Sequence, residues 1–137
     1  MMKAMHSPSA LTAFLACLHL AALQLARVPS PVADNAQADL IRRKGDEHER
    51  AYLDELRGRG LEIVEIERDG WAQAAAETAE ALSRGVDVVY QGVFVDGGWR
   101  GEADFLERQP DGSYEAADTK LVRTSNRRTS SSCFYTE

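Results

Sequence analysis

Two aspartates and a lysine near the C-terminal end of the chain have the types and spacing that suit a metal-dependent reaction. Asp118 and Lys120 form an Asp-x-Lys pattern, and Asp104 lies on the preceding predicted strand. Carboxylate oxygens are ligands that Mg²⁺ and Mn²⁺ prefer, and a backbone carbonyl such as that of Thr119 could add another. A lysine beside the ion can orient an attacking water or stabilise charge on a phosphate. The pattern therefore suggests hydrolysis of a phosphate ester.

The turn between the predicted strands that carry Asp104 and Asp118 indicates which of their side chains face each other. In the loop 109–112, proline suits the second position of a type I turn, and glycine suits the left-handed position after it. This register places Asp104 opposite Asp118 and Glu102 opposite Lys120. Opposed carboxylates repel each other, and a divalent cation between them would reverse that effect. The plainer interpretation of Glu102 and Lys120 is a cross-strand surface ion pair, which contributes little stability.

A histidine on a predicted helix is a third candidate ligand. The pattern is helical from Asp39 to about Leu56, and His48 falls on its apolar stripe. The members of that stripe are Ile41, Gly45, His48, Tyr52 and Leu56. His48 is therefore expected to face inward and to offer a ring nitrogen to the metal. The alternative is a core histidine with a satisfied hydrogen bond.

The other predicted elements form the framework for these residues. A short strand at 61–67 is followed by a helix that Asp69 caps and Gly85 ends. The expected buried face of that helix consists of Trp71, Ala74, Ala75, Thr78, Ala79 and Leu82. Three strands follow at 86–95, 100–107 and 113–121, with Asp96-Gly97-Gly98 as the first hairpin turn.

The N-terminal segment has two interpretations. Lys3 followed by an apolar run resembles a secretory signal, although polar residues interrupt the run and it is too short to span a bilayer. The second interpretation is an amphipathic helix that Ser7 caps, with Pro8 at its first position. On this interpretation, which we prefer, the protein is cytoplasmic and has no membrane partner. Separately, we assign Cys17 to the core.

Length and charge limit the classes of protein to consider. The chain has 137 residues, enough for one domain, and its net charge of −6 argues against a general nucleic-acid binder. Its two cysteines, Cys17 and Cys133, lie near opposite ends, and no cluster has zinc-ligand spacing. A disulfide framework and a zinc module are therefore not expected.

Three segments resemble one known family. KGDEHERAYLDEL, GEADFL and YEAADTK are similar to the RecB-type branch of the PD-(D/E)XK nucleases, and the likeness runs from about Ser7 to Val122. The resemblance implies an α/β fold with a restriction-endonuclease-like core, in which helices flank a mixed sheet. It also implies that His48, Asp104 and Asp118 hold Mg²⁺ or Mn²⁺, and that Lys120 is catalytic.

The resemblance further implies a substrate and a partner. Members of this family hydrolyse phosphodiester bonds of DNA, often beside a helicase domain or subunit. On this basis residues 1–122 are the N-terminal part of a nuclease domain, and 123–137 are an altered or truncated tail. Tyr135 fits the Gln-x-x-x-Tyr motif of the family, whereas Ser131 stands at its glutamine position. The alternatives are a catalytically inactive nuclease-fold binding module and a small exported protein.

The match also departs from the family in the helix. Two residues separate Gly45 from His48, where the RecB branch commonly has three between its glycine and histidine.

Overall fold

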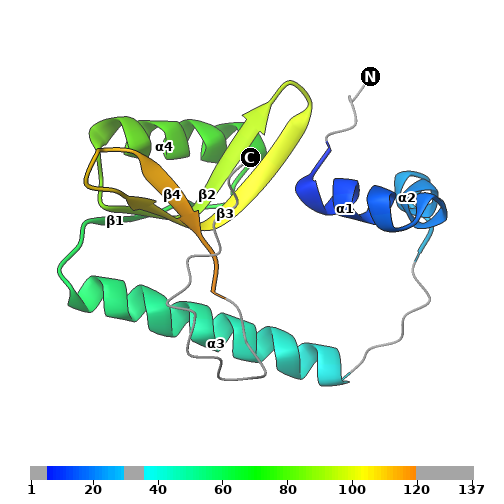
Figure 1. Ribbon diagram of the computed structural model, residues 1–137, viewed down its shortest axis with the longest axis horizontal. Coiled ribbons are helices and arrows are strands. Elements are labelled where there is room, and N and C mark those ends of the chain that lie inside the picture. Colours follow the sequence, from blue (N-terminus) through cyan, green and yellow to red (C-terminus); the bar gives the residue numbers. More distant parts are fainter. Residues whose placement is uncertain (1–5, 30–35, 120–137) are drawn as a thin grey trace.

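The fold is mixed α/β, and its centre is a four-stranded sheet in the order β1-β2-β3-β4 (Figure 1). We describe residues 6–29 and 36–119 of this computed structural model. The elements, in chain order, are α1 (Pro8–Ala16), α2 (Leu18–Leu25), α3 (Ala36–Gly58), β1 (Ile63–Glu65), α4 (Trp71–Arg84), β2 (Val88–Asp96), β3 (Trp99–Arg108) and β4 (Tyr114–Ala117).

The sheet combines one parallel and two antiparallel pairings. β1 and β2 are parallel and are joined by the crossover helix α4, as two parallel strands require. β2, β3 and β4 follow as antiparallel neighbours. α3 and α4 lie on opposite faces of the sheet, so the central strands are covered on both sides (Figure 1).

Each covered face has its own apolar core. Beneath α4, Ala74 and Ala81 pack with Val89, Val93 and Leu106 of the sheet. Beneath α3, Leu53 and Leu56 pack with Val88 and Phe105. Val88 and Val89 thus contact opposite helices, as the alternation of side chains along a strand requires. Burial of these side chains is the main force that holds both helices against the sheet.

Both predicted hairpin turns are confirmed. Gly97 and Gly98 connect the paired residues Asp96 and Trp99 with φ angles of 53° and 95°, which glycine adopts without steric strain. In the second turn, the Gln109 N–H donates to the Ser113 carbonyl at 2.7 Å.

The N-terminal helical segment differs from its prediction. Ser7 does cap α1, since its hydroxyl accepts from the Ala10 N–H at 3.2 Å, and Pro8 is the first helical residue. The helix is interrupted at Cys17, whose extended backbone separates α1 from α2. Cys17 is exposed, so its assignment to the core was wrong. Ala21 is the only buried residue of the two helices, because they share little surface with the sheet.

Two details of α4 differ from the sequence prediction. Its N-cap is Gly70, which makes no side-chain capping bond, and not Asp69. Its buried face includes Ala81, whereas Ala79 is exposed. Gly85 ends the helix in the left-handed conformation, as predicted.

The bounds of three other elements also differ from the prediction. α3 begins at Ala36, earlier than expected, and β1 and β4 are shorter than expected.

In the parts of the chain that the structure describes, no helix combines the length and the apolar character needed to cross a membrane.

Candidate active site

The predicted opposition of Asp104 and Asp118 agrees with the register of the sheet. Phe105 pairs with Ala117 on β3 and β4, so the next position along each strand brings Asp104 and Asp118 together. Their carboxyl groups are joined by a hydrogen bond. Both residues are partly buried. A bond between two carboxyl groups requires that one of them carry a proton.

Asp104 is the group that retains this proton. Its pKa is raised from the ordinary value of 3.8 to about 7. Burial is the largest cause, followed by the hydrogen bond to Asp118 and the negative charges of Glu49 and Asp118, while Arg68 acts in the opposite direction. Near neutral pH, the site is thus close to the point at which Asp104 exchanges its proton.

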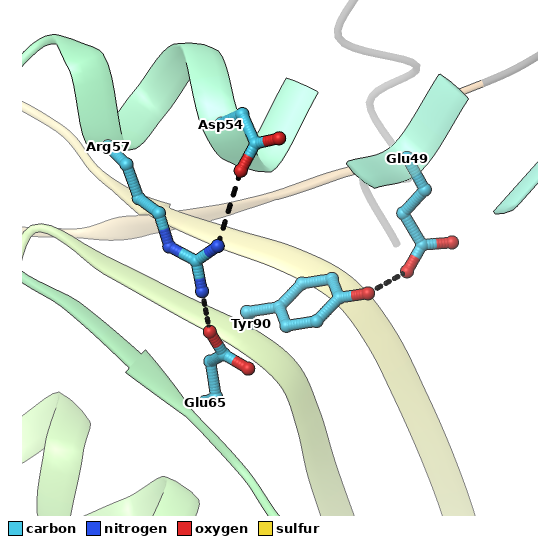
Figure 2. A network of polar contacts seen from close by, with 5 residues as sticks. All are labelled: Glu49, Asp54, Arg57, Glu65 and Tyr90. Carbon is cyan, nitrogen blue, oxygen red and sulfur yellow. Dashed lines mark hydrogen bonds and ion pairs between the residues drawn. The ribbon is translucent and has the colours of Figure 1, made fainter. Parts of the chain in front are cut away.

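Glu49 brings a third carboxylate toward this pair from α3. The Tyr90 hydroxyl donates to Glu49 Oε1 at 2.6 Å, as Figure 2 shows, and Gln91 Nε2 donates to the same oxygen at 2.5 Å. Burial and the bond to Glu49 raise the pKa of Tyr90 to about 12, so the hydroxyl keeps its proton and remains a donor. Two residues of β2 therefore fix the position of Glu49.

Gln91 adopts an unusual backbone conformation to make this contact. Its φ of 59° lies in the left-handed region, which costs a residue other than glycine roughly 1–3 kcal/mol. It stands between the pairs Tyr90–Phe105 and Gly92–Ala103, and hence across from Asp104. Tyr90 and Gln91 are neighbours in a strand, yet both reach Glu49 because the alternation of side chains is broken here. The strain thus lies at the site itself.

Arg68 connects the site to the loop between β1 and α4. Its guanidinium donates to Gln91 Oε1 and forms an ion pair with Glu102 at 3.0 Å. The same positive charge lowers the pKa of Asp104 against the larger effects that raise it. Arg68 thus supplies a positive charge that favours the ionised form of Asp104.

A second arginine links α3 to the sheet edge. Arg57 forms ion pairs with Glu65 of β1 and, at 3.3 Å, with Asp54 of its own helix (Figure 2). These pairs are half exposed or more, so they add little stability, and the apolar core under α3 dominates the attachment. That core holds the helix that carries Glu49.

No protein-family model, curated protein or solved structure matches this chain.

The prediction that His48 faces inward was wrong. His48 is exposed, and the partly buried side chain at this level of α3 is Glu49. The sequence interpretation assumed that Gly45, His48 and Tyr52 lie on the buried face of the helix. Leu53 is buried, however, and Glu49 lies one turn before it on the same face, so Glu49 and not His48 faces the sheet. Leu53 is the sequence signal that indicates Glu49. It lies four residues after Glu49, which places the two on one helix face, but five residues after His48.

Two of the site residues predicted from the sequence, Lys120 and Tyr135, lie outside the described residues. The segment predicted to be an altered tail, 123–137, also lies outside them. Within 6–29 and 36–119, no three His, Cys, Asp or Glu side chains are grouped as ligands of one metal ion. The described part of the site therefore consists of the Asp104–Asp118 pair, with Glu49 acting on it through its charge.

Sequence reasoning missed Arg68, Tyr90 and Gln91. Nothing in the pattern of β2 indicates a left-handed residue at Gln91, because the surrounding residues are typical of a regular strand.

Proposed function

We propose that this chain is a metal-dependent nuclease with a RecB-like PD-(D/E)XK core. The observation that carries the proposal is the pair of opposed, partly buried carboxyl groups, of which Asp104 has a pKa raised to about 7. Strongly perturbed carboxyl groups occur often at functional sites. The mixed sheet between two helices supports this fold assignment, and the segments that resemble the family contribute all three carboxylates.

The pair suits Mg²⁺ or Mn²⁺. Mg²⁺ keeps several waters and is commonly held by one or two carboxylates together with phosphates of the substrate. Asp104 and Asp118 are such a pair, and a bound cation would replace the shared proton and remove their repulsion. The ion, when bound, would polarise a phosphodiester and activate a water molecule.

The protein residues have separate tasks in this proposal. Asp104 and Asp118 hold the ion, and Glu49 adds negative charge that acts on Asp104 and attracts positive charge to the pair. Tyr90 and Gln91 keep Glu49 in place. Lys120, which the sequence places two residues after Asp118, orients the water or stabilises charge on the phosphate. DNA is the proposed substrate, and a helicase domain or subunit is the proposed partner.

Calorimetric titration with Mn²⁺ at pH 8 tests the metal site. We expect Asp104→Asn and Asp118→Asn each to weaken Mn²⁺ binding at least about 10-fold, because each removes one of two charged ligands. Glu115→Gln is the matched control, since Glu115 is an exposed carboxylate of β4 on the same hairpin and should bind like the unchanged protein. Unchanged Mn²⁺ affinity in Asp104→Asn would contradict the proposal.

The cleavage of single-stranded DNA in Mg²⁺ tests the reaction. We expect Asp118→Asn and Lys120→Ala to reduce the rate by about 100-fold or more, because charged groups at a phosphoryl centre contribute several kcal/mol. The melting temperature of Lys120→Ala should remain close to that of the unchanged protein. Equal cleavage rates in the two proteins would show that Lys120 is not catalytic.

A pair of neighbouring substitutions tests the corrected helix assignment. Glu49→Gln should weaken Mn²⁺ binding by about 3- to 10-fold, because it removes a negative charge that acts on Asp104. His48→Ala should leave the affinity unchanged, since His48 is exposed on another side of the helix. The opposite ranking would restore His48 as the ligand.

A binding module without catalysis is the second candidate. Asp104 and Asp118 are hydrogen-bonded to each other, and the described residues group no third ligand with them. DNA binding without Mg²⁺-dependent cleavage would favour this function.

A further inference from the structure

A small pocket lies between the start of α4 and the middle of β2 and β3, and Arg68 of the candidate site forms part of its lining. Its volume is about 190 Å³. It is lined by Arg68, Gly70, Trp71, Ala74, Val93 and Glu102. Apart from the Arg68–Glu102 ion pair and the core packing of Ala74 and Val93, this lining has no role in the site described above.

The lining combines an apolar surface with a polar rim. Trp71, Ala74 and Val93 supply the apolar part, and the indole of Trp71 is held by the guanidinium of Arg100, 4.4 Å from the ring centre. Arg68 and Glu102 supply a donor and an acceptor at 3.0 Å from each other. Such a pocket suits a flat ring whose edge both donates and accepts hydrogen bonds.

The size of the pocket limits the ligand to one ring system. An engineered apolar cavity of about 150 Å³ binds benzene, and drug-sized ligands need roughly 300 Å³ or more. The Arg68–Glu102 pair is solvent-accessible, with side-chain exposures of 58% and 35%, so it contributes little stability and opens at small cost. A ligand edge can therefore take over both partners.

The position of the pocket relates it to the carboxylate pair. Arg68 contacts Gln91 and Glu102, and its charge acts on Asp104. We propose that this pocket binds one nucleobase of the DNA chain whose phosphate is held near Asp104 and Asp118. The inference rests on the proposed nuclease function and adds a base-binding subsite to it.

Nucleoside titration of the full chain in EDTA tests the pocket without the metal. The chain has two tryptophans, Trp71 and Trp99, so NMR of their indole N–H signals gives a reporter and an internal control. We expect deoxyguanosine or deoxyadenosine to shift the Trp71 signal with a Kd on the order of 1 mM, and to leave the Trp99 signal in place. Deoxyribose 5-phosphate, which lacks the base, should shift neither signal.

Two variants test the geometry in different ways. A Cβ built at Gly70 meets no atom within 4 Å, so the backbone there accepts a side chain, and Gly70→Leu should raise the Kd at least about 10-fold by filling the pocket. Glu102→Gln keeps the shape and removes the charged acceptor, and should raise the Kd about 5-fold. An unchanged Kd in both variants, or no shift of the Trp71 signal, would overturn the proposal.

Two further measurements identify the ligand class and separate this inference from the nuclease proposal. Indole should bind at least about 5-fold more weakly than the nucleosides, since it offers no acceptor to Arg68; equal binding would overturn base recognition. Asp104→Asn should keep the nucleoside Kd while it loses Mn²⁺ binding. Nucleoside binding in a protein that cleaves no DNA would refute only the nuclease function, and DNA cleavage without nucleoside binding would refute only the base subsite.

Discussion

The raised pKa of Asp104 makes the free energy of unfolding depend on pH. The unfolded chain releases this proton near pH 3.8, whereas the folded chain keeps it to about pH 7. Between these values the folded state binds more protons, so this carboxyl group makes the free energy of unfolding decrease as the pH rises. The stabilisation is fully present below pH 3.8 and is lost as the pH passes through 7.

Thermal unfolding of Asp104→Asn at two pH values checks this behaviour. At pH 5 the asparagine resembles the protonated carboxyl group and should change stability little. At pH 8 it removes a charge beside Asp118 and Glu49 and should stabilise the metal-free protein by about 1 kcal/mol, a value reduced for partial exposure. Glu115→Gln should show no such difference between the two pH values. Equal effects of Asp104→Asn at both values would contradict the raised pKa.

Thr78 of α4 forms hydrogen bonds that join its helix to β2. Thr78 is 1% exposed, donates to the Ala74 carbonyl at 2.8 Å and accepts from the Val93 N–H at 2.9 Å. Thr78→Val keeps the shape but leaves that N–H without its acceptor, so it should lower the free energy of unfolding by about 1–3 kcal/mol. Thr12→Val is a matched control, because the Thr12 hydroxyl makes its bond on the exposed helix α1.

Urea unfolding monitored by circular dichroism measures both variants. A loss of stability in Thr78→Val no larger than that in Thr12→Val would show that the buried bond to β2 contributes nothing.

The elements that the sequence predicted well depend on local chemistry. The turn at Gln109–Gly112 sets a hairpin register through proline and glycine preferences, and that register places Asp104 opposite Asp118 in the fold. The end of α4 at Gly85 follows from the same kind of rule. These features need only a few neighbouring residues, so the sequence suffices to predict them.

The features that the sequence did not predict depend on packing. Glu49 and His48 are adjacent, and the contact of Leu53 with the sheet decides which of them faces inward. The left-handed backbone of Gln91 is held by contacts with Glu49 and Arg68, which come from other elements. No local propensity encodes a conformation that distant residues impose.

The helices α1 and α2 stand apart from the sheet and its two flanking helices (Figure 1). They expose large apolar side chains, namely Leu11, Phe14, Leu15, Leu18, Leu20, Leu23 and Leu25. Removal of residues 1–29 should therefore lower the melting temperature by no more than a few degrees, because little core is lost. It should also reduce the fluorescence of a bound hydrophobic dye by about half or more.

Calorimetry and a dye-binding titration of the shortened chain check both effects. Global unfolding on removal of this segment would show that the segment is an integral part of the core.

One backbone contact joins that N-terminal segment to the hairpin of β2 and β3. The His6 N–H donates to the Gly98 carbonyl, and the His6 carbonyl accepts from the Arg100 N–H, each at 2.8 Å. Both bonds use only peptide groups, which are identical in every copy of the chain. The hairpin edge can therefore form the same two hydrogen bonds with the N-terminal residues of a neighbouring copy. We expect protein concentration to govern this choice, so that concentrated solutions contain dimers formed by exchange of this segment.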